Sequence, residues 1–290
     1  MMRIAVAGAR GQLGAALVNE CAPAHETIAL GRAEIDVSDD AAVAAAMARV
    51  KPHLILNASA WTDVDAAEAH PIDALNTNAF GVRALARAAR AHGATLVHYS
   101  TDFVFDGKKT SPYTEADRPN PQGVYAASKL LGEWFALDAP SAYVLRVESL
   151  FGRAPGAGPA KGSVAKIVET LLAGGSPKAF EDRTISPTYI IDVARATRQL
   201  VESSAPAGLY HCVNSGHCTW LELAQALAQQ LGGAEMSSRL VPVRFSDMAL
   251  KAARPQYCAL SNDKLHAAGF DMPTWQDALA RYLATLSKRT

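Results

Sequence analysis

The first half of the chain alternates short apolar runs with longer stretches rich in alanine and leucine. Short apolar runs are typical of buried strands, and the longer stretches have the spacing of helices that cover a sheet. The expected strands are 3–7, 27–30, 53–57, 95–100 and 142–146. The expected helices are 12–21, 40–50, 72–92 and 125–137. Continuous apolar runs such as 54–56 indicate a sheet covered on both faces, so the sequence predicts a doubly wound α/β fold with a parallel, Rossmann-like sheet.

The second half begins with a segment rich in proline and glycine, 153–162, which we expect to be a loop. This loop divides the chain into a first domain, 1–150, and a smaller C-terminal lobe, 151–290. A strand is expected at 208–213, and we expect the region of about 185–215 to return to the first sheet. The other helices expected in this half are 163–173, 220–231, 263–268 and 275–286.

The composition is that of an ordinary globular protein, with 49% hydrophobic and 19% charged residues among 290. Lys plus Arg number 28 and balance 28 Asp plus Glu, so no long-range positive field favours nucleic acid or an anionic membrane surface. The N-terminal apolar run 4–9 is too short to span a membrane and leads into a glycine turn. We therefore expect a cytoplasmic protein without nucleic-acid or membrane partners.

The four cysteines have no CxxC spacing, and a chain of this size does not need disulfides. Two His-Cys pairs, His211-Cys212 and His217-Cys218, lie close in sequence. Neighbouring residues on a strand point to opposite faces, so His211 and Cys212 could share a metal only through a special turn. We expect reduced thiols and no metal.

The first expected strand runs into a GxxGxxG loop formed by Gly8, Gly11 and Gly14, which opens a helix. Glycine is needed where the turn is tight and where the backbone approaches a pyrophosphate, whose charge is then met by the helix N-terminus. A glycine triplet alone is a weak signal, but its place between a strand and a helix is the context that supports it. The sequence predicts that the first domain binds a dinucleotide.

The end of the second expected strand reads Gly31-Arg32, with no acid there. An acid at this point binds the ribose 2′-hydroxyl of NAD, whereas an arginine suits the 2′-phosphate of NADP. Arg32 therefore favours NADPH, with NADH as the second choice. The alternative is that Arg32 is a solvated surface residue.

The fourth expected strand ends in Ser100-Thr101-Asp102, and a later helix begins near Tyr125 and continues to Lys129. Tyr125 and Lys129 stand one helical turn apart, so the ammonium can lie near the phenol and lower its pKa. We expect Tyr125 to protonate the oxygen of a carbonyl that receives hydride, with Thr101 holding that oxygen. Lys129 would also hydrogen-bond the nicotinamide ribose. Each residue alone has an ordinary structural explanation, and their order behind a glycine loop carries the prediction.

At these residues the chain resembles the dTDP-4-dehydrorhamnose reductase family of the extended short-chain dehydrogenase/reductase superfamily, and the similarity runs over almost the whole length. STDFVFDG and the C-terminal ARPQ…KL pattern are more specific than the glycine loop. The segments that carry the resemblance are GARGQLG at Gly8, EIDVSD at Glu34, NASAWTDVDAAE at Asn57, STDFVFDG at Ser100, YAASKLLGE at Tyr125, SPTYIIDVA at Ser186, GLYHCVNSG at Gly208 and ARPQYCALSNDKL at Ala253.

The resemblance implies an NADPH-dependent reductase acting on a sugar nucleotide, with 151–290 as mainly the substrate-binding lobe. It implies a role in binding the cofactor phosphates for Gly11, Gln12 and Leu13, at the adenine for Asp36 and Val37, and on the ribose and nicotinamide side for Ala58, Ser59 and Ala60. Thr101 and Asp102 match its substrate-contacting pair, Tyr125 its proton donor and Lys129 its partner. Arg183 and Arg254 lie in family-like segments, and we expect them to face the substrate diphosphate.

The chain departs from the family after the fifth strand, where it reads Arg146-Val147-Glu148-Ser149 in place of an Arg followed by a Thr-Ser-Trp-like stretch. The identity of the sugar and the base therefore stays open. The alternatives are another sugar-nucleotide ketoreductase, an epimerase that retains NAD, and a non-catalytic dinucleotide-binding subunit like that of methionine adenosyltransferase β. The intact Tyr125, Lys129 and Thr101 favour catalysis. A homodimer is one expected assembly.

Overall fold

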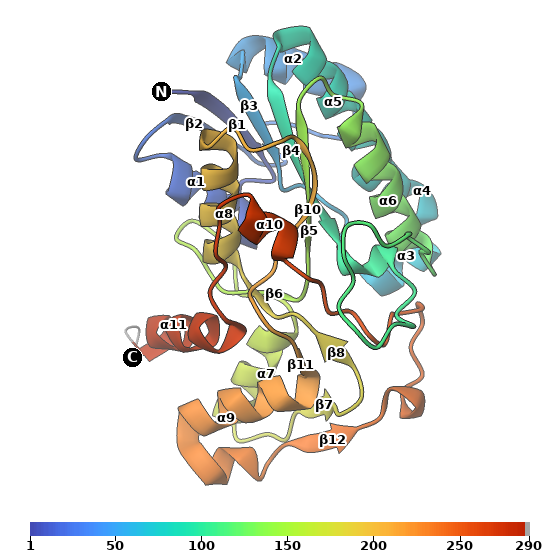
Figure 1. Ribbon diagram of the computed structural model, residues 1–290, viewed down its shortest axis with the longest axis vertical. Helices are drawn as coiled ribbons and strands as arrows, with labels where there is room; N and C mark the ends of the chain where they lie inside the picture. The colour runs from blue at the N-terminus through green and yellow to red at the C-terminus, as the bar shows by residue number, and fades with distance from the viewer. Residues whose placement is uncertain (288–290) are drawn as a thin grey trace.

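The computed structural model describes residues 1–287 and is built on a parallel sheet of six strands, seen in the upper part of Figure 1. The strand order is β10-β5-β4-β3-β1-β2, and every neighbouring pair is parallel. The strands are β1 Arg3–Ala7, β2 Glu26–Leu30, β3 Leu54–Asn57, β4 Thr95–Thr101, β5 Ala142–Val147 and β10 Gly208–His211. The order reverses at β1, between β2 and β3, which is the switch point where such sheets bind ligands. The predicted doubly wound, Rossmann-like fold is confirmed.

Helices cover both faces of this sheet because its strands are apolar on both sides. Ile4 and Val6 of β1 belong to one core cluster, which includes α1 Gln12–Cys21 and α8 Ile190–Glu202. Ala5 and Ala7, the alternate residues, belong to a second cluster with α2 Asp40–Val50 and α5 Gly81–His92. Helix α6, Val124–Leu137, packs beside α5 on that second face. The alternation of strand side chains thus produces the two helical layers.

The predicted helix 72–92 is divided into three consecutive segments. They are α4 Pro71–Leu75, a π-helical segment η1 Asn76–Phe80, and α5. A short helix α3, Val64–Ala69, precedes them, and the sequence pattern did not indicate it. Segment η1 packs against α6, the helix that begins beside Tyr125. A π-helical turn within a longer helix is frequently found at functional sites.

The C-terminal part contains short strands and helices around the carboxyl edge of the sheet (Figure 1). Helix α8 packs on α1 and was not predicted, because its first residues, Ile190 and Ile191, continue an apolar run that resembles a strand. The division of the chain near residue 150 stays a prediction. The remaining elements are η2 Asp102–Val104, β6 Leu150–Phe151, α7 Ser163–Leu172, β7 Lys178–Phe180, β8 Thr184–Ile185, β9 Thr188–Tyr189, β11 Cys218–Thr219, α9 Trp220–Ser237, β12 Val241–Val243, η3 Phe245–Asp247, α10 Asp263–Ala267 and α11 Trp275–Ser287.

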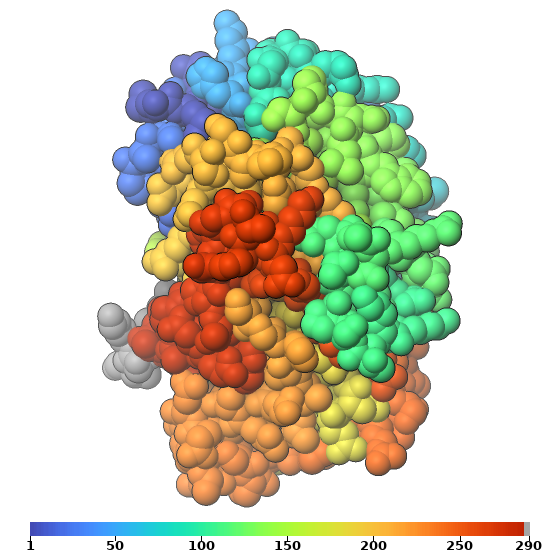
Figure 2. All heavy atoms as spheres, viewed as in Figure 1, coloured from blue at the N-terminus to red at the C-terminus, as the bar shows by residue number. Residues whose placement is uncertain are grey.

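The loop that follows β4 lies against residues from the end of the chain (Figure 2). Tyr113 of this loop donates its backbone N–H to the carbonyl of Ala259 at 2.8 Å, and its ring stacks on Phe105 at 4.1 Å. Segments about 150 residues apart in sequence therefore meet just beyond the carboxyl ends of β4 and β5. Among the described helices, none combines the length and apolar character needed to cross a bilayer.

Candidate active site

The glycine loop forms a tight turn between β1 and α1. Gly8 has φ +74°, and a Cβ on it would lie 2.6 Å from the backbone nitrogen of Ser59. A Cβ on Gly14 would collide with the carbonyl oxygen of Gly8. Both positions therefore require glycine, one for its conformation and both for the close approach of backbone. The loop after β1 and the loop after β3 touch at the switch point of the sheet.

Helix α1 begins at this loop, and no side chain caps the backbone amides of its first turn. Its N-cap is Gly11, which makes no side-chain cap bond, and its first turn holds no acidic residue. Such a helix end favours a negatively charged group. Gln12 donates its side-chain amide to the carbonyl of Gly152 at 2.9 Å, and Leu13 is buried in the core. The residues present fit the pyrophosphate of a dinucleotide.

The region after β2 contains an acid that the sequence reading overlooked. Glu34 accepts a hydrogen bond from the backbone N–H of Gly31 at 2.7 Å and forms an ion pair with Arg10 of the glycine loop at 2.8 Å. The expectation that no acid stands at the end of this strand is therefore wrong, because the turn after Gly31 brings Glu34 back to it. Arg32 is exposed. Two hydrogen bonds from Ser38 lower the pKa of Asp36, and the charge of Arg32 lowers it further.

The other residues predicted to line the cofactor lie near this loop or follow β3. Val37 is buried, and its carbonyl lies against Gly81 at the start of α5. Ala58, Ser59 and Ala60 are partly exposed and follow β3 directly. The side chain of Asn57 accepts hydrogen bonds from the Ser59 backbone at 3.2 Å and from its hydroxyl at 2.5 Å. This turn therefore holds its partly exposed residues in a fixed position.

Tyr125 lies in the first turn of α6 and faces the end of β4. Glu68 of α3 caps this helix by accepting the backbone N–H of Val124 at 2.8 Å. The ring of Phe103 meets the Tyr125 ring edge to face, with centroids 5.5 Å apart. Burial raises the pKa of Tyr125 to about 12, a hydrogen bond with Thr101 lowers it, and the charge of Asp102 raises it. The structure thus brings Tyr125, Thr101 and Asp102 together at the carboxyl edge of the sheet.

Lys129 follows one turn later, but it does not lower the pKa of the phenol as we expected. Its ammonium donates to the backbone carbonyl of Tyr99 at 2.5 Å, and Lys129 does not contribute to the pKa shift of Tyr125. Burial lowers the pKa of Lys129 to about 8, partly offset by the charge of Glu133. The expectation was wrong because helical spacing gives a shared face, whereas the long lysine side chain bonds to β4.

The whole chain matches a known family. Residues 2–288 fit the family model described as RmlD substrate binding domain. A dTDP-4-dehydrorhamnose reductase from Mycobacterium tuberculosis is 36% identical over 298 residues, covering 99% of this chain and 94% of that protein. The chain belongs to the dTDP-4-dehydrorhamnose reductase family. It is therefore an NAD(P)-dependent oxidoreductase, and the predicted resemblance is confirmed.

Two further relatives carry information about the cofactor and the substrate. The crystal structure of dTDP-4-dehydrorhamnose reductase from Bacillus anthracis in complex with NADP has a TM-score of 0.91 and 30% identity, covering 98% of this chain and 99% of that one. A dTDP-4-keto-6-deoxy-D-glucose reductase from Streptomyces niveus is 32% identical over 286 residues, covering 97% of this chain and 96% of that protein. Relatives of similar identity thus have names that give different sugar substrates.

The two arginines predicted to meet the substrate both have partners within the protein. Arg254 forms an ion pair with Asp65 at 2.9 Å and keeps some exposure. Arg183 is buried, donates to the carbonyl of Pro255 at 3.0 Å, and lies over the Phe103 ring at 5.7 Å. Its charge lowers the pKa of Asp102, although burial outweighs it and raises that pKa to about 6. Their contact with a diphosphate stays a prediction.

Two side chains that the sequence did not single out hold the candidate site together. Glu68 caps α6, as described above. Asn78 of η1 accepts the backbone N–H of Trp61 at 2.9 Å and donates to the Ser128 hydroxyl at 3.0 Å. Asn78 therefore links the loop after β3 to the helix that carries Tyr125. Their segment is visible in the sequence, but their partners are not, because the bonds join distant parts of the chain.

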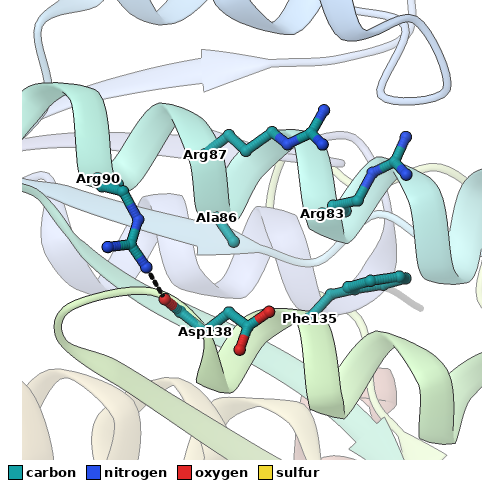
Figure 3. A pocket seen from close by; sticks show the side chains of 6 residues that line it. All are labelled: Arg83, Ala86, Arg87, Arg90, Phe135 and Asp138. Atoms are coloured by element: carbon teal, nitrogen blue, oxygen red, sulfur yellow. Dashed lines mark hydrogen bonds between the residues drawn. The ribbon is translucent and has the colours of Figure 1, made fainter.

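A hollow of about 310 Å³ lies elsewhere, between α5 and α6 (Figure 3). Arg90 reaches across it and donates to the backbone carbonyl of Asp138 at 2.5 Å. Asp138 follows the last residue of α6, at the opposite end from Tyr125. This hollow therefore lies away from the catalytic candidates.

His211, Cys212, His217 and Cys218 do not form a metal-binding group in the structure. Within residues 1–287, the one group of three potential metal-ligating side chains is Asp102, Glu148 and Cys258. The ring of His211 instead contacts the carbonyl oxygens of Tyr113 and Ser261, each at 3.1 Å.

Proposed function

We propose that this member of the family uses NADPH to reduce the 4-keto group of a deoxy-sugar nucleotide, converting dTDP-4-dehydro-L-rhamnose to dTDP-L-rhamnose. The observation that carries the proposal is the Tyr125 phenol beside the Thr101 hydroxyl, at the sheet edge where the glycine loop ends. The names of the relatives from Mycobacterium tuberculosis and Bacillus anthracis support the substrate. A ketoreductase needs a positioned proton donor at this point.

The bound nicotinamide would supply a hydride to the carbonyl carbon. Tyr125 would donate its phenolic proton to the carbonyl oxygen as charge develops there. A pKa of about 12 suits this role, because the phenol keeps its proton at neutral pH. Thr101 would hold the same oxygen, and Lys129, fixed through the Tyr99 carbonyl, would bind the nicotinamide ribose.

NADPH is the proposed cofactor because two arginines stand near the end of β2, and the acid there, Glu34, already bonds to Arg10 and to the Gly31 backbone. Arg32 follows Gly31 directly, and Arg10 reaches the same turn through Glu34. A guanidinium binds phosphate with two parallel hydrogen bonds, which suits the 2′-phosphate. Gly8, Gly11, Gln12, Leu13 and Gly14 would hold the pyrophosphate. NADH remains the second choice.

A cytoplasmic location fits this proposal, because Cys21, Cys212, Cys218 and Cys258 are all buried free thiols. A homodimer is also proposed, from the sequence alone.

The proposal is tested with a panel of 4-keto-6-deoxy sugar nucleotides, assayed by the loss of NADPH absorbance. We expect the highest kcat/KM with dTDP-4-dehydro-L-rhamnose. A higher value with dTDP-4-keto-6-deoxy-D-glucose would assign the substrate named for the Streptomyces niveus relative. NAD that copurifies with the protein and is recycled would favour an epimerase. Absence of turnover with every sugar, together with tight binding to an adenosyltransferase, would favour a regulatory subunit.

A further inference from the structure

Two carboxyl groups stand side by side at the ends of neighbouring strands. Strands β4 and β5 are parallel, and their register pairs Thr101 with Val147. Asp102 directly follows β4 and Glu148 directly follows β5, so both leave the sheet at the same point of its carboxyl edge. Asp102 contacts the proposed site by accepting a hydrogen bond from the Thr101 hydroxyl.

Both carboxyl groups are shielded from water. Asp102 is 3% exposed and Glu148 is 2% exposed. Glu148 accepts the backbone N–H of Ser186 on Oε2 at 2.6 Å, whereas its Oε1 is buried without a hydrogen-bond partner. Oxygens of the two carboxyl groups and the Cys258 sulfur all lie within 4.8 Å of one another. An ionised oxygen without a partner in such a place is strongly unfavourable.

Arg183 is the cation that faces this group, and it does not neutralise both acids. Its Nε donates to the Pro255 carbonyl, and its terminal nitrogen lies 3.7 Å from the Cys258 sulfur. Arg183 takes part in none of the ion pairs formed among residues 1–287. Two ionised carboxylates and one guanidinium would leave a buried net negative charge. Like charges this close disfavour full ionisation of both groups.

The other titratable groups around the pair are Cys258, Cys218 and Tyr257, which face Glu148, and Tyr125, which faces Asp102. Burial raises the pKa of each; the charge of Glu148 raises it further for the first three, and the charge of Asp102 for Tyr125. None of them therefore supplies a positive charge or an easily lost proton to the pair. Burial raises the pKa of Asp102 to about 6, and burial together with Asp102 raises that of Glu148 well above its ordinary value.

We propose that Glu148 is a positioning residue of the reductase site: it shares one proton with Asp102, and this proton controls the direction in which the Thr101 hydroxyl donates. The proposal rests on the proposed function for its effect on catalysis. The proton resides on Glu148 Oε1 or on Asp102, and its transfer breaks the O–H bond on one carboxyl group and forms an O–H bond on the other. A proton shared at Glu148 Oε1 removes the cost of leaving that buried oxygen ionised without a hydrogen-bond partner.

The position of the proton matters because Thr101 has a single hydrogen to donate. Its oxygen already accepts the backbone N–H of Phe103 at 3.2 Å and donates to Asp102 at 3.0 Å. When Asp102 is ionised, the hydroxyl is held toward the carboxylate. When Asp102 carries the proton, it donates to Thr101, and the Thr101 hydrogen is then available to the carbonyl oxygen of the substrate. Glu148 keeps that proton within reach.

The shared proton is tested on the protein alone by infrared absorption at neutral pH. We expect a band from a protonated carboxyl group in the wild type, and its loss in Glu148→Gln and in Asp102→Asn. Glu169→Gln, which changes an exposed carboxyl, serves as the control and should retain the band. Absence of the band in the wild type, or its persistence in both Glu148→Gln and Asp102→Asn, would overturn the proposal.

The positioning role is tested by kinetics. In Glu148→Gln we expect kcat to fall at least about tenfold, because a donor to the carbonyl oxygen is lost, with KM for NADPH unchanged. The limb of the kcat/KM profile that reports ionisation of Asp102, near pH 6 and distinct from the Lys129 limb near pH 8, should move to lower pH, because a second acid beside Asp102 disfavours its ionisation. In the Asp102→Asn background, Glu148→Gln should cause no further fall.

Independent losses that multiply in the double variant, or an unmoved pH limb, would overturn the role of Glu148. If the wild type shows the infrared band but no turnover, the proposed function is overturned and the shared proton is upheld. The two failures are thus distinguished.

Discussion

The ammonium of Lys129 donates to the backbone carbonyl of Tyr99, and this bond fixes α6 against β4. Tyr99 stands two residues before Thr101 on the strand, and Lys129 stands four residues after Tyr125 on the helix. The bond therefore holds the element that carries the phenol against the element that carries the hydroxyl. In the proposed mechanism, Lys129 therefore helps to position the phenol through the backbone of the strand.

A first prediction concerns the charge of Lys129. Its pKa of about 8 means that the ammonium is present below that pH and lost above it. We expect kcat/KM to fall as the pH rises through about 8, and we expect Lys129→Met to lower kcat at least about tenfold. The Lys129→Arg variant keeps its positive charge above pH 8, so its kcat/KM should show no fall near pH 8. An unchanged limb in that variant would assign the limb to another group.

A second prediction concerns cofactor choice. Arg32→Ala should raise KM for NADPH by about tenfold or more, because a charge-assisted bond to phosphate is lost, and should change KM for NADH little. Arg49→Ala, an exposed arginine in the last turn of α2, is the matched control and should leave both constants unchanged. Steady-state kinetics with each cofactor measure the difference. Equal effects on the two cofactors would make Arg32 a solvated surface residue.

A third prediction concerns the glycine loop. Gly8→Ala places a methyl group 2.6 Å from the Ser59 nitrogen at a positive φ, so we expect lower stability and loss of the rise in Tm caused by NADPH. Gly93→Ala has a similar φ of +63° with nothing within 4 Å of the added group. It should cost about 1–2 kcal/mol and keep the rise in Tm. Thermal unfolding with and without NADPH compares the variants. A normal NADPH effect in Gly8→Ala would contradict the assignment of the loop.

A fourth prediction follows from the raised pKa of Asp102. The folded state keeps this proton to about pH 6, whereas the unfolded state loses it near the ordinary value of 3.8. The contribution of Asp102 to the free energy of unfolding is therefore full below about pH 4 and lost as the pH rises through about 6. Urea unfolding across this range should show a smaller fall in Asp102→Asn. Asp138→Asn, an exposed control, should follow the wild type, and identical curves for all three would refute the shift.

Much of the central sheet could be predicted from the sequence, because its buried strands are short apolar runs separated by amphipathic helices. The bounds of β1, α1 and α2 agree with the prediction to the residue. The short strands of the C-terminal part were missed, since two or three residues give no period. Helix α8 was missed because it follows Thr188–Tyr189 in one apolar run.

The sequence indicated which residues meet at the candidate site better than it indicated their individual contacts. Tyr125, Thr101 and Asp102 come together because their strand and helix end at one edge, which motif order can indicate. The bond from Lys129 to Tyr99 and the return of Glu34 to Gly31 depend on side-chain reach and turn geometry. Glu148 was noticed only as a departure from a family pattern. Its proximity to Asp102 follows from the register of β4 and β5, which the sequence does not specify.

The central claim is that the Tyr125 phenol donates the proton in the reduction. The most direct measurement is kcat for NADPH-dependent reduction of dTDP-4-dehydro-L-rhamnose by Tyr125→Phe, with the Kd for NADPH measured on the same preparation. We predict that kcat falls about a hundredfold or more while Kd changes little, because the ring stays and the proton is lost. Turnover close to that of the wild type would contradict the account.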